Sequence, residues 1–312
     1  MRIAVFGTGG VGGYFGGRLA QAGEEVAFIA RGEHLRAMQT QGLRVESIKG
    51  DFALAHVQAT DNPAQLGVVD VVFVCVKTWQ LPLAAPSLHP LIGPDTCVVP
   101  LQNGLEAATQ LAAVLRLEAV VGGTCGIYSF ISEPGCIRHV GLEPSIIIGE
   151  LDQRSSERTR ALHAVLEHAG IAVAIASNIQ IPLWEKFLIL RWGVIGAVTR
   201  APAGILRRLP ETLDLIDRSC REVVTVARAH DVVLSEDILK RNMALLESLP
   251  ESATTSFQRD VMDGRPSELD ALVNALVRLG EQAQVPTPLH QFFSHGLLPM
   301  EMKARGEITF PV

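Results

Sequence analysis

The sequence lacks the residue patterns that mark several common classes of protein. Aromatic residues make up 5% of the 312 residues, and the five cysteines are scattered without any C-x-x-C pair. Because neither a disulfide framework nor a cysteine zinc site fits that usage, we expect a reducing compartment. The nine histidines show no H-x-x-x-H or H-E-x-x-H spacing, and the chain has no G-x-S-x-G elbow and no Walker-type G-K-[ST] string. The sequence therefore predicts no metal site, no serine nucleophile on such an elbow and no Walker-type phosphate loop.

Neither charge nor hydropathy indicates a nucleic acid or a membrane as a partner. The chain has 27 Lys and Arg residues against 33 Asp and Glu residues, a formal net charge of −6. A nucleic-acid or anionic-membrane partner would need a basic stripe, which the sequence does not contain. No apolar run approaches the ~20 residues of a membrane helix, and glycines interrupt the first run directly after Phe6, too early for a signal peptide. We expect a soluble, cytoplasmic protein.

The first half of the chain alternates β-rich runs with helical stretches, which is typical of a parallel sheet covered by helices. Strands are predicted at Arg2–Phe6, Glu25–Ala30, Val68–Val76, Thr96–Leu101, Ala119–Thr124 and Ser145–Ile148, and helices at Val11–Gln21 and Leu105–Leu115. Alternation in period two over Leu43–Ser47 and Phe52–Gln58 predicts a hairpin. The expected fold class is α/β, with an N-terminal Rossmann-type, doubly wound parallel sheet.

The second half of the chain has a different texture, because long amphipathic segments replace the short β-rich runs. Helices are predicted at Pro182–Val198, Glu211–His230, Glu236–Ser248, Ser267–Gln282 and Pro288–Met302. Turn signals such as Val285-Pro286-Thr287-Pro288 separate these segments. We therefore predict a Rossmann domain over residues 1–178 and an all-helical domain over residues 179–312.

A glycine-rich string lies between the first strand and the first helix. The residues Gly7, Thr8, Gly9, Gly10, Val11 and Gly12 form a G-x-G-x-x-G pattern. In that setting the first glycine permits the tight turn, the second lets a pyrophosphate approach the backbone, and the third allows close packing of helix and strand. The N-terminus of the helix also favours the negative charge of phosphates. The string predicts a dinucleotide site.

The end of the second predicted strand indicates which dinucleotide binds. An NAD site usually has Asp or Glu about 20 residues beyond the glycines, where it binds the ribose hydroxyls. Here that region reads Ala30-Arg31-Gly32, and Arg31 stands nineteen positions after Gly12. A guanidinium group can hold a 2′-phosphate with two hydrogen bonds. The alternative is a solvated arginine after a strand, but the pattern favours NADPH.

Six short strings occur in one order along nearly the whole chain. They are Gly7–Gly12, Ala30-Arg31-Gly32, Val74-Cys75-Val76-Lys77, Gln102-Asn103-Gly104, Trp184-Glu185-Lys186-Phe187 and Arg265-Pro266-Ser267-Glu268-Leu269. As a set they resemble the ketopantoate reductase family (2-dehydropantoate 2-reductases and their relatives). The resemblance implies a Rossmann domain, a helical C-terminal domain, a cleft between them, and reduction of a 2-oxo acid by NADPH.

The resemblance places the family's proton donor on Lys186. Hydride delivery to a ketone leaves negative charge on the oxygen, and an ammonium group can neutralise or protonate it. The family also implies cofactor contacts for Lys77, Asn103 and Glu268, a substrate contact for Asn103, and a substrate-binding serine at Ser256. From the residues alone, a helix-surface lysine is the favoured interpretation of Lys186, and only the resemblance reverses that order. Asn103-Gly104 could likewise be a simple turn.

Three positions depart from the family's pattern. Well-known members carry asparagines four and eight residues after the lysine and three residues before the serine, where this chain has Leu190, Val194 and Ala253. Aliphatic groups remove hydrogen-bonding capacity, so we expect a more apolar substrate pocket. Arg191 and Arg200 are alternative carboxylate ligands, although structural or surface roles are favoured for both.

The sequence therefore predicts an NADPH-dependent enzyme that reduces a small 2-oxo acid, with the conversion of 2-dehydropantoate to pantoate as the best named activity. Two alternatives stay open: a reductase of the same family acting on a different 2-oxo acid, and a non-catalytic NADP(H)-binding regulator. The sequence does not decide between a monomer and a homodimer.

Overall fold

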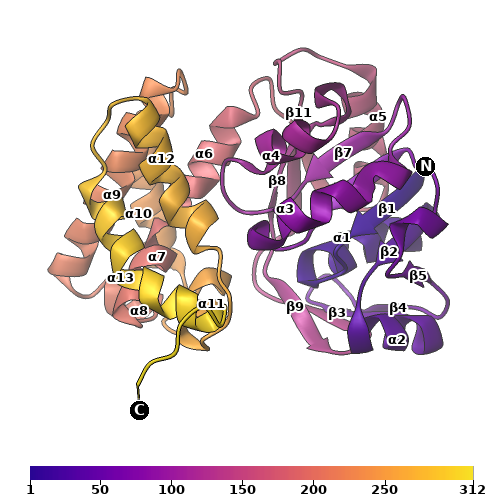
Figure 1. Ribbon diagram of the computed structural model, residues 1–312, viewed down its shortest axis with the longest axis horizontal. Helices are drawn as coiled ribbons and strands as arrows, with labels where there is room; N and C mark the ends of the chain where they lie inside the picture. Colours follow the sequence, from indigo (N-terminus) through magenta and orange to yellow (C-terminus); the bar gives the residue numbers. More distant parts are fainter. Residues whose placement is uncertain (312) are drawn as a thin grey trace. The chain divides into compact units, whose positions relative to one another are not determined.

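The computed structural model describes residues 1–311, and the chain divides into two compact units (Figure 1). Unit 1 consists of Met1–Gln102 and Ala107–Ile179. Unit 2 begins at Gln180 and also includes the short segment Asn103–Glu106, which interrupts unit 1 in the sequence. The sequence interpretation, with its single divide after residue 178, did not foresee that this short segment joins the second unit.

The central feature of unit 1 is a five-stranded parallel sheet. Its strands are β1 (Arg2–Phe6), β2 (Glu25–Ile29), β5 (Gln58–Thr60), β6 (Val71–Val74) and β7 (Cys97–Pro100), in the order β5-β2-β1-β6-β7. All four neighbouring pairs are parallel. The chain adds β2 on one side of β1 and β6 on the other, so a switch point lies at the carboxyl end of β1. In open sheets of this kind, ligands bind at such a switch point.

Both faces of this sheet are covered, because alternate side chains of its strands enter different hydrophobic cores. In β1, Ile3 and Val5 pack with residues of α1 (Gly10–Gln21) and α2 (Gly32–Gln41). Ala4 and Phe6 point the other way and pack with α3 (Leu81–Ala84) and α4 (Ala107–Val114). The arrangement confirms the predicted doubly wound parallel sheet.

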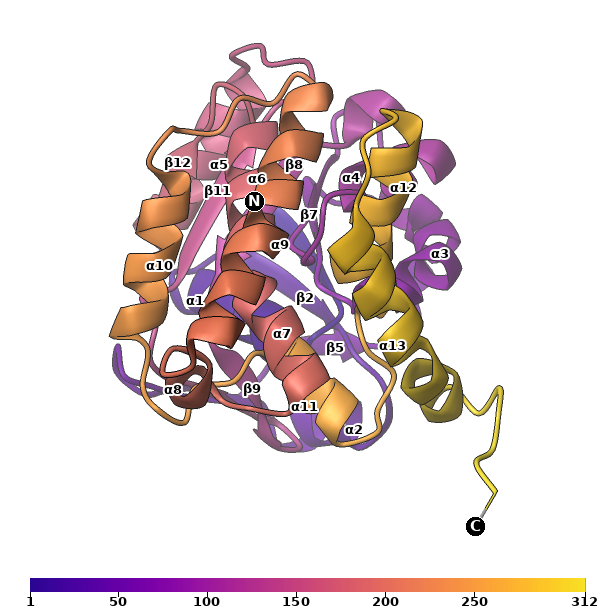
Figure 2. The ribbon, with the colours of Figure 1, turned by 90° about the vertical axis from the view of Figure 1, so that its left-hand side faces the viewer.

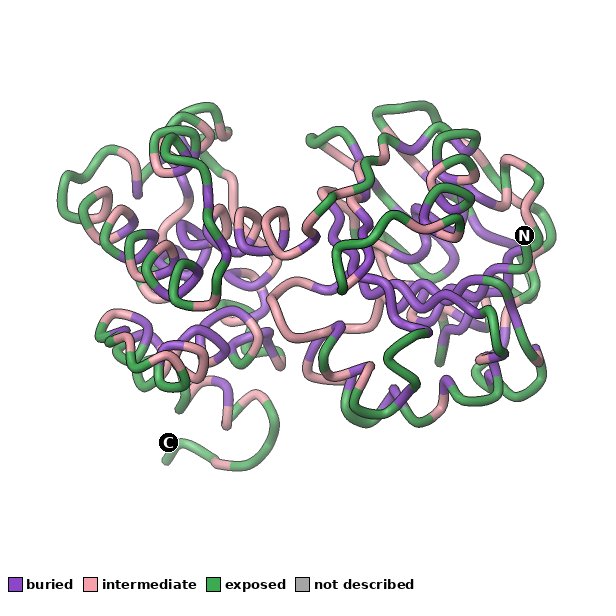
Figure 3. Tube along the Cα trace, turned by 90° about the horizontal axis from the view of Figure 1, so that it is seen from above, coloured by how far each residue is buried: buried purple, intermediate pink, exposed green. Residues whose placement is uncertain are grey.

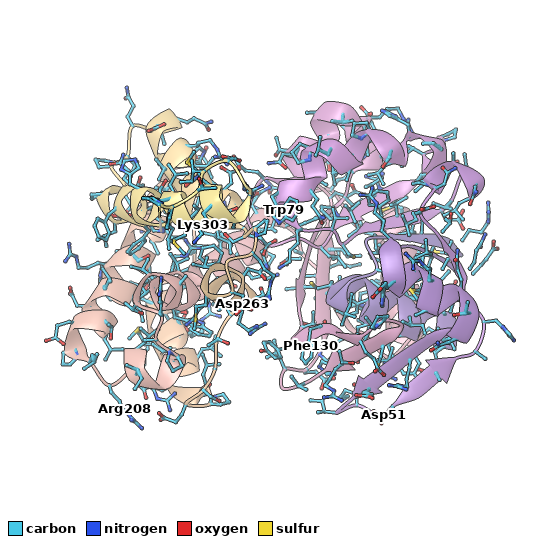
Figure 4. All side chains as sticks on the ribbon, turned by 60° about the horizontal axis from the view of Figure 1, so that its bottom comes forward. Asp51, Trp79, Phe130, Arg208, Asp263 and Lys303 are labelled. Atoms are coloured by element: carbon cyan, nitrogen blue, oxygen red, sulfur yellow. The ribbon has the colours of Figure 1, made fainter. Side chains whose placement is uncertain are left out.

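Two smaller sheets complete unit 1. One contains β3 (Leu43–Ser47), β4 (Phe52–Leu54), β9 (Ser129–Glu133) and β10 (Cys136–His139), in the order β4-β3-β10-β9. Its edge strand β9 carries Phe130, which is labelled in Figure 4 and is 40% exposed. The other contains β8 (Gly122–Gly126), β11 (Ser145–Gly149) and β12 (Ala172–Ile175), in the order β12-β11-β8. Helix α5 (Glu157–His168) precedes β12.

The predicted hairpin is confirmed in its first part and wrong in its second. β3 and β4 pair in antiparallel fashion, with Leu43 opposite Leu54. The single strand predicted over Phe52–Gln58 does not exist, because β4 ends at Leu54 and Gln58 begins β5, which joins the central sheet through β2. The interpretation overlooked a shift of phase at the break, because the large apolar residues Phe52 and Leu54 stand at even positions and Val57 at an odd one. Strands β9, β10 and β12 and helix α5 were also not predicted.

All the regular secondary structure in the described residues of unit 2 is helical. Its helices are α6 (Gln180–Ile189), α7 (Arg191–Thr199), α8 (Ala203–Leu206), α9 (Pro210–Ala229), α10 (Ile238–Ser248), α11 (Ser256–Met262), α12 (Ala275–Gln282) and α13 (Pro288–Ala304). Both α7 and α10 contact the long helix α9 (Figure 2). Helix α7 is the most enclosed of these, because the residues from Arg191 to Ala197 are all buried.

The helix predicted over Pro182–Val198 is wrong in its continuity. The structure divides it into α6 and α7 at Leu190, whose ψ of −1° departs from helical geometry. The segment predicted as a helix over Ser267–Gln282 begins its helical part with a π-helical turn, Asp270–Asn274, before α12. Figure 3 shows the buried residues gathered inside each unit. Among the described residues, no helix has both the length and the apolar character needed to cross a bilayer.

Candidate active site

The glycine-rich turn has the geometry of a phosphate cradle. Gly7 has a φ of +100°, and a Cβ there would lie 2.7 Å from the Val76 nitrogen. A Cβ on Gly12 would lie 2.4 Å from the Gly7 carbonyl oxygen and 2.8 Å from Val5 Cγ1, so the absence of a side chain lets α1 pack on β1. At Gly9 nothing lies within 4 Å of the position a Cβ would take. The backbone at Gly9 is therefore open to a ligand.

The turn is fastened to the neighbouring strand rather than flexible. The carbonyl oxygen of Ile29, the last residue of β2, accepts hydrogen bonds from the Gly7 and Thr8 amides at 3.1 Å each and from the Thr8 hydroxyl at 3.1 Å. Gly9 is the N-cap of α1, and no side chain caps the helix. The first N–H groups of a helix have no partner within the helix, so they are available to an anion.

Gly10 has a different reason to be glycine. A Cβ there would lie 2.3 Å from the Ser129 carbonyl oxygen, because β9 passes against the start of α1. The sequence could not reveal this contact, since Ser129 stands 119 positions further along the chain.

Two candidate residues and the glycine-rich turn of unit 1 follow the carboxyl ends of adjacent strands. Arg31 stands two residues after β2, the glycine turn follows β1, and Lys77 stands three residues after β6. Because β2, β1 and β6 are consecutive in the sheet, these residues share one edge. Arg31 is exposed, and no hydrogen bond or ion pair engages its guanidinium group among the described residues. This edge fits the phosphates and ribose of a dinucleotide.

The segment Asn103–Glu106 is held in unit 2 at both ends. The Asn103 side-chain nitrogen Nδ2 donates to Glu268 Oε2 at 2.9 Å, and Arg278 Nη2 donates to Glu106 Oε2 at 2.5 Å. Between these contacts, Gly104 has a φ of +98°, and a Cβ there would lie 2.9 Å from the Ala271 carbonyl oxygen. The structure thus brings together Asn103 and Glu268, which stand 165 positions apart in the sequence.

Glu268 is buried, and the backbone around it is held by another carboxylate. Glu268 is 3% exposed, and its neighbour Ser267 is completely buried. Glu301, on α13, accepts hydrogen bonds from the Ser267 amide at 3.1 Å and from the Ser267 hydroxyl at 2.5 Å. The Ser267 hydroxyl in turn accepts from the Leu269 amide at 3.2 Å. These contacts fix the backbone on both sides of Glu268, and no pattern in the sequence indicated the part played by Glu301.

Lys186 lies on α6 between side chains that anchor the helix in the core. Trp184 and Phe187 are 3% and 1% exposed, and their rings pack edge to face with centroids 6.1 Å apart. On the outer side, Glu185 pairs with Arg241 at 2.9 Å. Lys186 itself is half-buried, and no hydrogen bond or ion pair engages its ammonium group within residues 1–311. Lys186 is therefore a cation that is free to meet a ligand, on a helix whose backbone is anchored in the core.

Ser256 is the first residue of α11, and its two neighbouring threonines have other partners. Thr255 caps the helix by accepting from the Gln258 amide at 3.1 Å. The Thr254 hydroxyl accepts from Arg259 Nη1 at 3.2 Å. No hydrogen bond engages the Ser256 hydroxyl among the residues described. Of the three hydroxyls, that of Ser256 is the one available to a ligand.

The positions that depart from the family's pattern have different environments. Val194 is completely buried in the core of unit 2, whereas Leu190, at the break between α6 and α7, and Ala253 are half-buried. Arg200 is exposed and ends α7 in a left-handed conformation with a φ of 59°. Arg191 is 0% exposed and has only internal partners, so the structural role favoured from sequence fits and a carboxylate-binding role does not.

Comparison with known proteins identifies the family. The model of "Ketopantoate reductase PanE/ApbA" matches residues 3–153, and that of its C-terminal domain matches residues 178–300. A 2-dehydropantoate 2-reductase of Mesorhizobium japonicum is 29% identical over 92% of this chain and 94% of its own length. A solved PanE/ApbA family ketopantoate reductase of Ralstonia eutropha is 30% identical with a TM-score of 0.90, covering 98% of this chain and 100% of its own. This chain belongs to the ketopantoate reductase family.

A second solved relative agrees with this identification. The 2-dehydropantoate 2-reductase of Geobacter metallireducens is 27% identical with a TM-score of 0.91, and the match covers 96% of this chain and 99% of the other. Membership makes the chain an oxidoreductase and confirms the resemblance drawn from the six strings. Among residues 1–311, no group of three or more His, Cys, Asp or Glu side chains is arranged to hold a metal ion.

Proposed function

We propose that this ketopantoate reductase family member uses NADPH to reduce a 2-oxo acid to the 2-hydroxy acid, with 2-dehydropantoate as the first substrate to test. The observation that carries the proposal is the half-buried ammonium group of Lys186, which no counter-charge engages within residues 1–311. A half-buried ammonium group that has no counter-charge among those residues can bind an anion, so its presence supports a site for an anionic or developing negative charge.

The residues of unit 1 fit a phosphorylated dinucleotide. The open backbone at Gly9, the uncapped start of α1 and the unpaired Arg31 guanidinium all favour phosphate groups. Arg31 supports NADPH over NADH, because a 2′-phosphate would give its guanidinium two charge-assisted hydrogen bonds. When bound, the reduced nicotinamide would supply the hydride.

Lys186 would bind and protonate the oxygen of the carbonyl group that is being reduced. Negative charge develops on that oxygen as hydride arrives, and an ammonium group within hydrogen-bonding distance stabilises it and gives up a proton to form the hydroxyl. Trp184 and Phe187 anchor the helix that carries Lys186, so its backbone needs little rearrangement during the reaction.

Asn103 and Ser256 would orient the bound molecules. Because the Asn103 amide nitrogen donates to Glu268, its oxygen Oδ1 is left as an acceptor for a hydroxyl of the ribose or substrate. The Ser256 hydroxyl would donate to the carboxylate of the 2-oxo acid. Lys77, at the end of β6, would contact the cofactor.

A 2-oxo acid other than 2-dehydropantoate is the second candidate substrate. Leu190 is half-buried next to the helix that carries Lys186, and it offers no hydrogen bond to a hydroxyl group of the substrate. A site that lacks such partners favours an apolar substituent over a hydroxylated one. The candidate substrates therefore differ in the polarity of the group attached to the oxo carbon.

A substrate panel followed by NADPH absorbance would test the proposal. Purified protein would be assayed with 2-dehydropantoate and with 2-oxo acids that carry alkyl or aryl groups, each with NADPH and with NADH. We expect turnover with at least one 2-oxo acid and a preference for NADPH. Tight NADPH binding without oxidation across the panel would contradict catalysis and support the regulator alternative.

A further inference from the structure

Arg191 is the first residue of α7, and its guanidinium group is completely enclosed. Its Nε donates to the Phe187 carbonyl oxygen at 2.9 Å, and its Nη1 donates to the Leu272 carbonyl oxygen at 2.6 Å and to His290 Nε2 at 3.0 Å. The guanidinium carbon also lies 3.9 Å from the centre of the Phe187 ring. Because Arg191 is 0% exposed, neither substrate nor cofactor can reach it.

A neutral histidine connects this cation to a carboxylate. Arginine can only donate, so His290 Nε2 must accept, and its Nδ1 therefore carries the proton and donates to Glu222 Oε2 at 2.6 Å. Burial lowers the pKa of His290 to about 4, which keeps it neutral at physiological pH. Burial also lowers the pKa of Arg191 to about 9, so the guanidinium still carries its charge there. The three side chains thus form a network with a buried positive end and a half-buried negative end.

One hydrogen bond of Arg191 is made to the helix that carries Lys186. Phe187 is the residue after Lys186, and its carbonyl group lies in the last turn of α6. The carbonyl groups in the last turn of a helix need partners from outside the regular ladder, and here the Arg191 side chain supplies one. The Arg191 contact therefore holds a carbonyl group in the last turn of α6.

A second hydrogen bond of Arg191 is made to the segment that carries Glu268. Leu272 lies in the π-helical turn Asp270–Asn274, and its amide donates to the Glu268 carbonyl oxygen at 2.9 Å. A π turn breaks the regular pattern of backbone bonds and often marks a functional site. Arg191 Nη1 donates to the Leu272 carbonyl oxygen and Nε donates to that of Phe187. One planar guanidinium group therefore links the backbone next to Lys186 with the segment from Glu268 to Leu272.

We propose that Arg191 is a positioning residue, which holds the helix of the proton donor Lys186 at a fixed distance from the segment of Glu268. The proposal rests on the proposed function, because it takes Lys186 as the proton donor. It differs from a stabilising role: His290 and Glu222 serve to balance the buried charge, whereas the contacts with Phe187 and Leu272 serve to set the geometry of the site.

The two roles can be separated by variants that remove the balancing charge and the contacts with the two carbonyl groups independently. E222Q leaves Arg191 charged and in contact with both carbonyl groups, but it removes the balancing charge. R191Q leaves the half-buried carboxylate of Glu222 without its cation and cannot reach two carbonyl groups at once. The double variant R191Q/E222Q has neither charge, so its stability should recover relative to R191Q, since an unpaired charge withdrawn from water is the costly state.

Each variant would be examined by urea unfolding, by NADPH-dependent turnover and by NMR of the apoprotein. The chain contains five lysines, so ¹³C-dimethylation of their amines gives a simple spectrum in which K186R identifies the Lys186 resonance. We expect R191Q/E222Q to fold, to bind NADPH within about threefold of wild type, and to lose about tenfold or more in kcat, the range for a misplaced catalytic group. The Lys186 resonance should shift while those of Lys49 and Lys240 stay unchanged.

Two outcomes would overturn the inference. One is a kcat in R191Q/E222Q that returns to the wild-type value as stability recovers, which would make the role purely structural. The other is a tenfold loss of kcat in E222Q without a shift of the Lys186 resonance in either variant. If K186R itself turns over like wild type, the proposed function fails instead, and the NMR comparison still reports whether Arg191 positions Lys186.

Discussion

His290 should make the stability of unit 2 depend on pH in a defined window. Burial lowers its pKa from 6.5 to about 4 in the folded chain, whereas the unfolded chain takes up the proton near 6.5. Between these values the unfolded state binds more protons, so stability is complete above about pH 6.5 and falls as the pH falls toward 4. A tenfold change in the proton affinity of one group corresponds to about 1.4 kcal/mol, and the linkage relation gives a loss of about 2 kcal/mol between about pH 7.5 and about pH 5.0.

The free energy of unfolding at these two pH values can be measured from urea unfolding followed by tryptophan fluorescence. Trp184 and Trp192 are buried in unit 2, so a Trp79→Phe background makes the signal report that unit. His290→Gln keeps a donor and an acceptor but does not titrate, and it should lose less than about 0.5 kcal/mol over the same interval. His168→Gln, an exposed substitution on α5, is the control. Equal pH dependence in wild type and His290→Gln would refute the reasoning.

The remaining predictions concern the glycine-rich turn and Arg31 of unit 1 and Asn103 of unit 2. Gly12→Ala should lower Tm by roughly 4 °C or more, because its Cβ would lie 2.4 Å from a carbonyl oxygen. Gly9→Ala should leave Tm unchanged and weaken NADPH binding, because nothing lies near its Cβ position. The opposite ranking of the two Tm values by calorimetry would contradict the assignment of this turn as the phosphate site. Arg31→Ala should raise the Kd for NADPH by roughly tenfold or more and the Kd for NADH by less than about threefold in fluorescence titrations. Equal effects on the two Kd values would show that Arg31 does not bind the 2′-phosphate. Asn103→Asp should place a second carboxylate next to Glu268 and lower the free energy of unfolding by roughly 1–3 kcal/mol at neutral pH. Acidification should restore this stability, because it protonates one of the two carboxylates. A loss of stability in urea unfolding that does not depend on pH would argue against repulsion between them.

Local sequence patterns were sufficient to predict the central sheet. The run Arg2–Phe6, the glycines and the following helix are contiguous, and their physical requirements act within about twenty residues. Strand β9 was missed because most of it faces solvent at an edge, which removes the alternation of apolar and polar residues on which such predictions depend. Its close approach to Gly10 is a tertiary contact that no local pattern contains.

The candidate site shows the same division between local and distant effects. The sequence could single out Lys186, Asn103 and Glu268 by resemblance, but not that Asn103 belongs to unit 2 and donates to Glu268. Nor could it predict the break at Leu190, because helix propensity is continuous there. The sequence left the role of Arg191 open, whereas the structure shows it buried and hydrogen-bonded to two carbonyl groups. The burial of a single residue depends on the whole fold, so local sequence patterns do not predict it.

The central claim is that the ammonium group of Lys186 protonates the reduced carbonyl oxygen. Its most direct test is the single-turnover rate of NADPH oxidation by Lys186→Ala, with a saturating 2-oxo acid that the wild type reduces and with Lys240→Ala on the exposed face of α10 as the matched control. We predict a fall of roughly 100-fold or more for Lys186→Ala, the range for loss of a general acid, and no change for Lys240→Ala. A wild-type rate in Lys186→Ala would contradict the account.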